Sequence, residues 1–239
     1  MPPYFYTLVY QNGGRIFSED GKNCLLNSPE ALEAAQFLIA LDLQHKVIPS
    51  ISEIQDTSTQ DLFLSQKLGM FFSGRYYVSD LQKMAGNTLK WGVAPAIHKE
   101  GRERVNTTPS PYGWVISSGT KNPEKVWELY EYLIIGEGEK MLAKAGYNIP
   151  ILKSLAYSGL FLANPNHPKG VNKIFLDDVP YTLPSPVSLY IESSRFSTLV
   201  SDEMTKIKTG AISVDRGMEY LTKSVNDIIN ENSLKRNKN

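Results

Sequence analysis

Apolar residues recur at helical spacing in several stretches of the chain, and the clearest stretch covers residues 28–44. Ser28 is a natural N-cap, Pro29 occupies the first helical position, and Glu30 adds a negative charge to the first turn. The stripe that this helix is expected to bury consists of Leu32, Ala35, Leu38 and Leu41. The pattern predicts an amphipathic helix that packs on a core along one face.

The same spacing predicts further helices along the rest of the chain. They are expected at residues 59–67, 122–134, 171–178, 188–208 and 213–231. In residues 122–134, the side expected to be buried consists of Val126, Trp127, Tyr130, Leu133 and Ile134. Trp127 is therefore predicted to lie in the core, with contact to a ligand as the alternative. In residues 213–231, the buried side is expected to consist of Val214, Met218, Leu221, Val225 and Ile229.

Short apolar runs bounded by turn residues separate these helices. Three of them are predicted to be strands: residues 68–72, 91–94 and 112–116. Helix and strand signals therefore alternate along the chain, which is typical of an α/β fold.

An aromatic segment around a glycine stands out at residues 71–77, which read Phe-Phe-Ser-Gly-Arg-Tyr-Tyr. An amphipathic helix precedes this segment and Lys-Trp-Gly-Val-Ala-Pro follows it at residues 90–95. This order resembles the ligand-closing lobe of bacterial family 1 extracellular solute-binding proteins, the maltose-binding-protein-like sugar receptors of ABC importers. In that family the segment usually reads Gly-x-Trp, and the tryptophan stacks on a sugar. The matching position here is Tyr76, which keeps a flat apolar face and adds a hydroxyl.

Other segments match the same family in the same order. The aromatic residues 3–6 followed by Asn12-Gly13-Gly14 resemble its aromatic helix and Asn-Gly-Gly turn, and residues 27–34 resemble the helix start that follows. Further resemblances lie at residues 113–117, 122–128 and 148–154. The resemblance thus covers nearly the whole chain.

The resemblance implies an α/β fold of the periplasmic-binding-protein type II kind, mainly its second, C-terminal lobe, with the first lobe largely missing. Residues 1–108 would form the N-terminal portion of the second lobe, and residues 157–239 its remaining portion with the C-terminal helices. Residues 109–156 would complete the first lobe. We expect this apolar segment to fold back on the lobe, to associate with another chain or to be poorly ordered, and we expect sugar binding by the chain to be weak.

The resemblance also implies where a ligand would bind. Tyr76 takes the stacking position, and Arg75 beside it is a candidate to reach a hydroxyl or an anionic group of the ligand, with a solvent-exposed arginine as the alternative. Further aromatic candidates are Tyr4, Tyr6, Tyr112 and Tyr190. For each of these four, the alternative is a half-buried tyrosine with a packing role.

The function implied is capture of a mono- or oligosaccharide between two lobes and its delivery to the membrane permease of an ABC importer. This is a binding function without catalysis. A carbohydrate-active enzyme, a lectin-like module and a truncated remnant that binds nothing are the alternatives. An enzyme would need two carboxylates facing each other across the aromatic cleft, and the adjacent pair Asp177 and Asp178 is better explained as a polar helix end.

Composition and the spacing of single residue types bear on the possible partners, metal sites and cofactors. Twenty-five basic and twenty-five acidic residues give a net charge of zero, which does not favour nucleic acid as a partner. The three histidines, His45, His98 and His167, lie far apart, so we expect no metal site, and no phosphate-loop or dinucleotide motif suggests a cofactor. The only cysteine is Cys24, which leaves no intrachain disulfide. The chain begins without a signal peptide, so an extracytoplasmic location, in the periplasm or on a lipid anchor, follows from the resemblance alone.

Overall fold

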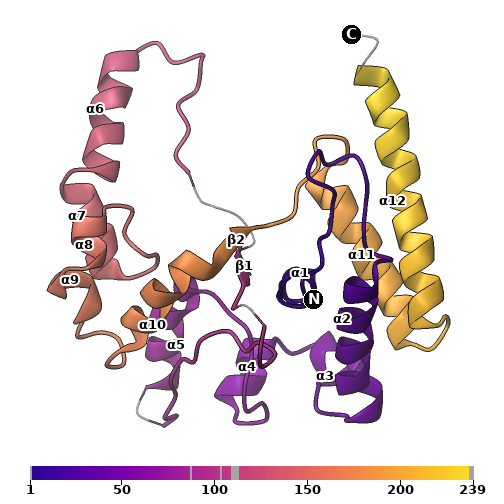
Figure 1. The fold of residues 1–239 in the computed structure, drawn as a ribbon. Coiled ribbons are helices and arrows are strands. Elements are labelled where there is room, and N and C mark those ends of the chain that lie inside the picture. Colours follow the sequence, from indigo (N-terminus) through magenta and orange to yellow (C-terminus); the bar gives the residue numbers. More distant parts are fainter. Residues whose placement is uncertain (1, 87, 103, 109–112, 237–239) are drawn as a thin grey trace. The chain divides into compact units, whose positions relative to one another are not determined.

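The computed structural model describes residues 2–86, 88–102, 104–108 and 113–236. These residues form two compact units (Figure 1). Unit 1 consists of Met1–Ile54, Ala96–Ser110 and Tyr181–Asn239, and unit 2 of Gln55–Pro95 and Pro111–Pro180. These boundaries differ from the predicted division at residues 108 and 156, and the assignment of segments to receptor lobes stays a prediction.

Unit 1 is a helical assembly with a short strand pair. Its helices are α1 (Pro2–Gln11), α2 (Pro29–Ile39) with the continuing π-turn η1 (Ala40–Gln44), α3 (Ile51–Gln55, at the unit boundary), α11 (Ser193–Lys208) and α12 (Val214–Arg236). The strands β1 (Asn106–Thr108) and β2 (Thr182–Pro184) pair in parallel, with Asn106 opposite Thr182. α11 and α12 lie side by side, and α2 packs against α12 (Figure 1).

The core of unit 1 lies between α1, α2, α11 and α12. The Ser28 side chain accepts a hydrogen bond from the Ala31 amide, so the predicted N-cap of α2 is confirmed. α12 buries Met218, Leu221, Val225 and Ile229, as predicted, and Val214 is partly buried. The buried face of α2 is centred on Ala31, Ala34, Ala35, Leu38 and Ile39, so Leu32 and Leu41 lie at its edge and not at its centre.

Unit 2 is built from short helices. They are α4 (Thr59–Leu64), the 3₁₀ turn η2 (Arg75–Tyr77) leading into α5 (Val78–Ala85), α6 (Pro123–Ile134), α7 (Glu137–Ala145), α8 (Lys153–Ala156), α9 (Gly159–Leu162) and α10 (Val171–Asp178). A second 3₁₀ turn, η3 (Val179–Tyr181), leads from α10 to β2. α10 has the predicted bounds.

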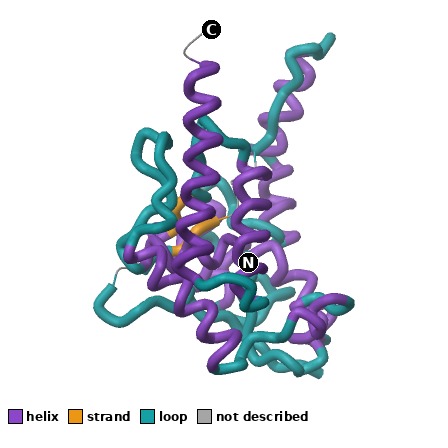
Figure 2. The backbone as a smooth tube through the Cα atoms, turned by 90° about the vertical axis from the view of Figure 1, so that its right-hand side faces the viewer, coloured by secondary structure: helices purple, strands orange, loops and turns teal. Residues whose placement is uncertain are grey.

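Three of the predicted features are wrong, each for a physical reason. Residues 68–72, 91–94 and 113–116 form no strands, because a strand needs a ladder of hydrogen bonds to a neighbour, and among the described residues β1 and β2 alone form one (Figure 2). Tyr112, the first residue of the third predicted strand, lies outside the described residues. The predicted helix at residues 188–208 begins only at Ser193, since residues 188–191 form a turn closed by a bridge between Ser188 and Ile191. α6 has no buried residue, and Trp127 is 52% exposed and stacks on Tyr130, so its predicted core role is wrong.

Candidate functional site

In the turn that carries Tyr76, the tyrosine ring lies against the backbone of Gly74. Tyr76 belongs to η2 and is 48% exposed. A Cβ atom at Gly74 would lie 2.6 Å from Cε1 of the Tyr76 ring, a distance that real Cβ atoms do not tolerate. A side chain at position 74 would therefore displace the Tyr76 ring, because the ring lies directly against the Gly74 backbone. The Gly-x-aromatic order in the sequence thus has a steric cause.

Aromatic side chains also pack around the rest of this turn. The Phe71 ring lies 4.9 Å from the Phe63 ring of α4 and 5.8 Å from the Tyr77 ring, the latter edge to face. Aromatic pairs at such distances attract each other beyond the area they bury. One side of the turn is thus held by apolar packing, while the Tyr76 ring remains half in solvent.

Arg75 turns inward from the same 3₁₀ turn. Arg75 is only 6% exposed, so the alternative of a solvent-exposed arginine is wrong. Nη2 lies 3.1 Å from Nδ1 of His167, and the guanidinium carbon lies 5.4 Å from the centre of the Phe161 ring. Burial lowers the pKa of Arg75 to about 10, which still leaves the side chain charged at neutral pH. Its inward direction favours a structural role over direct contact with a ligand.

Tyr4 and Tyr6 belong to α1 in unit 1. Tyr6 is 5% exposed and stacks on Phe196 with 5.9 Å between ring centres, and Tyr4 is partly buried against the same core. Burial raises the pKa of Tyr4 to about 12 and also raises the pKa of Tyr6. The geometry agrees with the packing alternative for both. Tyr112 lies outside the described residues.

Tyr190 borders a shallow groove of about 500 Å³ in unit 1. The groove is lined by residues 188–193 together with Asn232, Lys235 and Arg236 of α12. Nδ2 of Asn232 donates a hydrogen bond to the Tyr190 carbonyl oxygen at 2.8 Å, and the Arg236 guanidinium lies 5.8 Å from the ring centre. Tyr190 is thus held by α12 at the edge of a groove of mixed apolar and charged lining.

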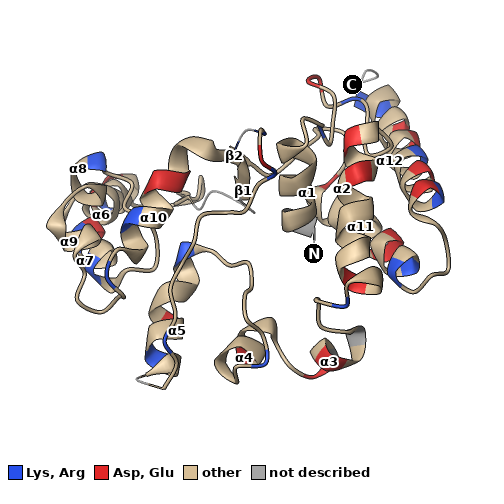
Figure 3. Cartoon of the chain, turned by 60° about the horizontal axis from the view of Figure 1, so that its bottom comes forward, with Lys and Arg blue, Asp and Glu red and all other residues tan. Residues whose placement is uncertain are grey.

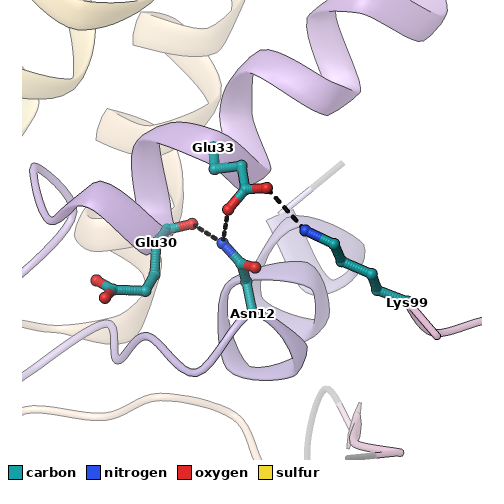
Figure 4. A network of polar contacts seen from close by, with 4 residues as sticks. All are labelled: Asn12, Glu30, Glu33 and Lys99. Atoms are coloured by element: carbon teal, nitrogen blue, oxygen red, sulfur yellow. Dashed lines mark hydrogen bonds and ion pairs between the residues drawn. The ribbon is translucent and has the colours of Figure 1, made fainter. Parts of the chain in front are cut away.

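The Asn-Gly-Gly turn after α1 is fixed by a polar network (Figure 4). Nδ2 of Asn12 donates to the Glu30 carbonyl oxygen at 3.1 Å and to Oε2 of Glu33 at 2.7 Å, while Nζ of Lys99 lies 3.0 Å from Oε1 of Glu33. These contacts lower the pKa of Glu33, with the Asn12 hydrogen bond as the largest cause. Gly14 is required at the turn because its Cβ would lie 2.8 Å from Cβ of Glu30. The network attaches both the turn and the Lys99 loop to α2.

The described residues contain no cluster of three or more His, Cys, Asp or Glu side chains placed to hold a metal ion. Asp177 pairs with Lys173 on the surface of α10 at 2.8 Å. Cys24 is buried, its amide donates to Oδ1 of Asn226 at 2.7 Å, and burial raises the pKa of its thiol to about 11. The thiol is therefore protonated and shielded at neutral pH.

Charge is distributed with both signs intermixed along α12 (Figure 3). None of the described helices is long and apolar enough to cross a membrane.

Sequence reasoning missed the residues that hold the turn from within. His167, Ser79 and Asn172 form a buried group around Arg75, with contacts of 3.1 to 3.2 Å to the two imidazole nitrogens. The spacing of four between Arg75 and Ser79 was the one available signal, because residues four apart share a helix face. Nothing in the sequence indicated that His167 would lie between them.

The family is now identified by comparison with known proteins. The model of the family described as bacterial extracellular solute-binding protein matches residues 3–134, more than half of the chain, and the chain belongs to this family. Putative binding proteins of Brucella abortus and Brucella suis are 25% identical over 163 residues. Each match covers 67% of this chain and 38% of the relative, so the chain is similar to well under half of those proteins.

Solved structures show the same fold. An ABC substrate-binding protein from Listeria monocytogenes in complex with cycloalternan gives a TM-score of 0.78 at 19% identity, covering 95% of this chain and 56% of that one. A solute-binding protein from Thermotoga lettingae bound with α-D-tagatose gives 0.74 at 20%, over 94% and 55% of the chains. The maltotriose-bound maltodextrin-binding domain from Bdellovibrio bacteriovorus gives 0.72 at 21%, over 98% and 58%. The α/β fold of the periplasmic binding proteins is therefore confirmed, as a portion of such a protein.

Proposed function

We propose that this chain is the substrate-binding component of an ABC importer and captures a carbohydrate for delivery to a membrane permease. The observation that carries the proposal is the half-exposed Tyr76 ring, which lies on Gly74 in a turn held by aromatic packing. A sugar presents a face of C–H groups that stacks on such a ring, and its hydroxyls form hydrogen bonds around the edge. The sugar ligands named for the similar solved structures support this class of ligand.

The direct test is calorimetric titration of the protein with a panel of mono- and oligosaccharides. For the sugar that binds, Tyr76→Ala is expected to weaken binding by about 1 to 3 kcal/mol through lost stacking area, with little loss of stability. Tyr157→Ala is the matched control, because Tyr157 is an exposed tyrosine of the same unit outside the turn. Unchanged affinity in Tyr76→Ala would remove Tyr76 from the site.

We expect the chain to bind sugar without cleaving it and without a cofactor. Capture without catalysis predicts that the bound sugar is recovered unchanged after long incubation, whereas a glycoside hydrolase would yield shorter products that chromatography detects. Binding is also expected to need no metal or organic cofactor. Retained affinity after chelator treatment supports this expectation, and loss of affinity restored by one divalent ion would overturn it.

The location and the partners complete the proposal. The family is described as extracellular, and we place the chain in the periplasm or on a lipid anchor at the cell surface, where a permease receives the ligand. Completion by first-lobe residues or self-association stays a prediction for residues 109–156. Light scattering on the purified chain tests it, since a monodisperse monomer that binds sugar at micromolar concentration would contradict it.

A further inference from the structure

Arg75 belongs to the turn that carries Tyr76, and its side chain is buried. No ion pair to an acidic side chain is found for Arg75 among the described residues, and its Nε and Nη1 atoms have no hydrogen-bond partner there. A buried charge is costly unless neighbouring groups stabilise it. The groups that do so are Nδ1 of His167 and the Phe161 ring.

The contacts of His167 determine which of its ring nitrogens carries the proton. Nδ1 lies 3.1 Å from Nη2 of Arg75 and 3.2 Å from Nδ2 of Asn172, which also donates to the Phe161 carbonyl oxygen. A guanidinium has only donors and the Asn172 amide group is turned so that it donates, so Nδ1 must be the acceptor. The proton of the neutral ring is therefore on Nε2, 3.1 Å from Oγ of Ser79.

Ser79 continues this chain of hydrogen bonds to the backbone. Its hydroxyl lies 3.1 Å from the Gly146 carbonyl oxygen and 3.2 Å from that of Ala145. The Nε2 proton of His167 is donated to Ser79, and Ser79 donates to these carbonyl oxygens. Arg75 therefore connects through one imidazole to the end of α7 and to the first turn of α10.

The His167 ring packs directly against the backbone of Gly146, which restricts where the ring can lie. A Cβ atom at Gly146 would lie 2.1 Å from Cε1 of His167, and Gly146 has φ +70°, so only glycine fits beside the ring. Arg75 lies in η2 and Ser79 one helical turn later, in α5. His167 thus contacts one helical face at residue 75, directly before Tyr76, and at residue 79, three positions after it.

We propose that His167 is the positioning residue of the ligand turn: by accepting from Arg75 and donating to Ser79, it fixes η2 and so presents the Tyr76 ring for stacking. The inference rests on the proposed function of Tyr76 in binding sugar. His167 itself does not touch the ligand and acts through the backbone of residues 75–79.

The test separates positioning from a general loss of structure by three substitutions. His167→Phe keeps a ring but removes both hydrogen-bonding nitrogens, and His167→Asn keeps an acceptor near the place of Nδ1. Arg75→Met removes the buried charge and keeps an unbranched apolar side chain. It tests the same contact from the other side if His167→Phe does not fold. We expect His167→Phe and Arg75→Met to weaken sugar binding about tenfold and His167→Asn to restore most of this loss.

A double-mutant cycle shows whether the effect passes through Tyr76. In a Tyr76→Ala background, Arg75→Met and His167→Phe are expected to cause no further loss of affinity. An undiminished further loss, or failure of His167→Asn to restore binding in a folded protein, would overturn the inference.

Hydrogen exchange of the unliganded protein keeps this test independent of the proposed function. His167→Phe is expected to speed exchange at the amides of residues 76–79 more than in α11 and α12. If the wild-type chain binds no sugar but this exchange pattern appears, the proposed ligand is wrong and the positioning role stands. Uniform exchange in all regions would overturn the role itself.

Discussion

α12 in unit 1 and α6 in unit 2 have similar sequence patterns and opposite surroundings. Both have apolar residues at helical spacing. α12 buries Met218, Val225 and Ile229 completely and Leu221 almost completely, whereas none of the twelve residues of α6 is buried and Leu129 is 56% exposed. An amphipathic pattern therefore predicts which face of a helix is apolar, but the pattern does not establish that another segment of the chain covers that face.

The largest expected difference is in local stability. Amides in the middle of α12 are expected to open only with unit 1 as a whole, while those of α6 lack buried side chains to hold the helix. We therefore expect exchange in α6 to be faster than in α12 by several orders of magnitude. Mass spectrometry after deuterium labelling measures this difference. Equal protection in both helices would mean that α6 is covered in solution, and light scattering on the same sample would show whether a second chain covers it.

The next largest expected difference is in the free energy of unfolding when one leucine of each helix is replaced by alanine. Leu221→Ala leaves a cavity in the unit 1 core and should reduce the free energy of unfolding by about 2 to 5 kcal/mol. Leu129→Ala on α6 is the matched control and should change it by less than about 0.5 kcal/mol. Denaturant titration measures both. A cost above about 2 kcal/mol for Leu129→Ala would show that the exposed face is buried in solution.

Low pH is expected to reduce the stability of unit 2 more than that of unit 1. Burial, together with the charge of Arg75, lowers the pKa of His167 to about 4 from its usual 6.5. The unfolded chain therefore binds a proton at higher pH than the folded one, so stability present above pH 6.5 is lost as pH falls toward 4. The histidines of unit 1, His45 and His98, are both exposed.

The measurement is thermal melting of unit 2 between pH 7 and pH 4, followed by residue-resolved hydrogen exchange. The melting temperature of the wild-type unit should fall across this range, and the slope should be smaller in His167→Asn, which cannot titrate there. An identical slope in the variant would exclude His167 as the cause.

The smallest expected effects come from surface ion pairs of the two helices. Lys235 pairs with Glu231 on α12 at 2.7 Å, and Lys125 pairs with Glu128 on α6 at 2.9 Å, all with exposed side chains. Solvent screens such pairs, so replacing either lysine by alanine should change the free energy of unfolding by at most about 0.5 kcal/mol. The same denaturant titration checks this expectation. A larger cost on α6 alone would indicate a more ordered helix than its burial implies.

Helix positions were predictable because their signals are local. Ser28 with Pro29 and the α12 stripe gave the correct elements from capping and spacing alone. Strand positions were not, because an apolar run such as residues 91–94 becomes a strand only beside a partner, which the run itself does not encode. Trp127 was placed in the core for the same reason, since its exposure depends on what faces α6.

The candidate site shows the same limit. The Gly74 and Tyr76 turn was predictable from the resemblance, and the structure adds the steric reason for the glycine. The burial of Arg75 was not predictable, because His167 lies 92 positions away in the sequence. Whether Tyr4, Tyr6, Tyr112 and Tyr190 contact a ligand stays a prediction.

The burial of Cys24 has a practical consequence for labelling this protein with fluorescent dyes. Its thiol is buried, protonated at neutral pH and the only one in the chain, so maleimide dyes should leave the native protein unlabelled. A cysteine introduced at Tyr157, on the exposed surface of unit 2, would then carry a single fluorophore at a known position. The chain therefore needs no cysteine removal before a fluorophore is used to test binding of the proposed ligand.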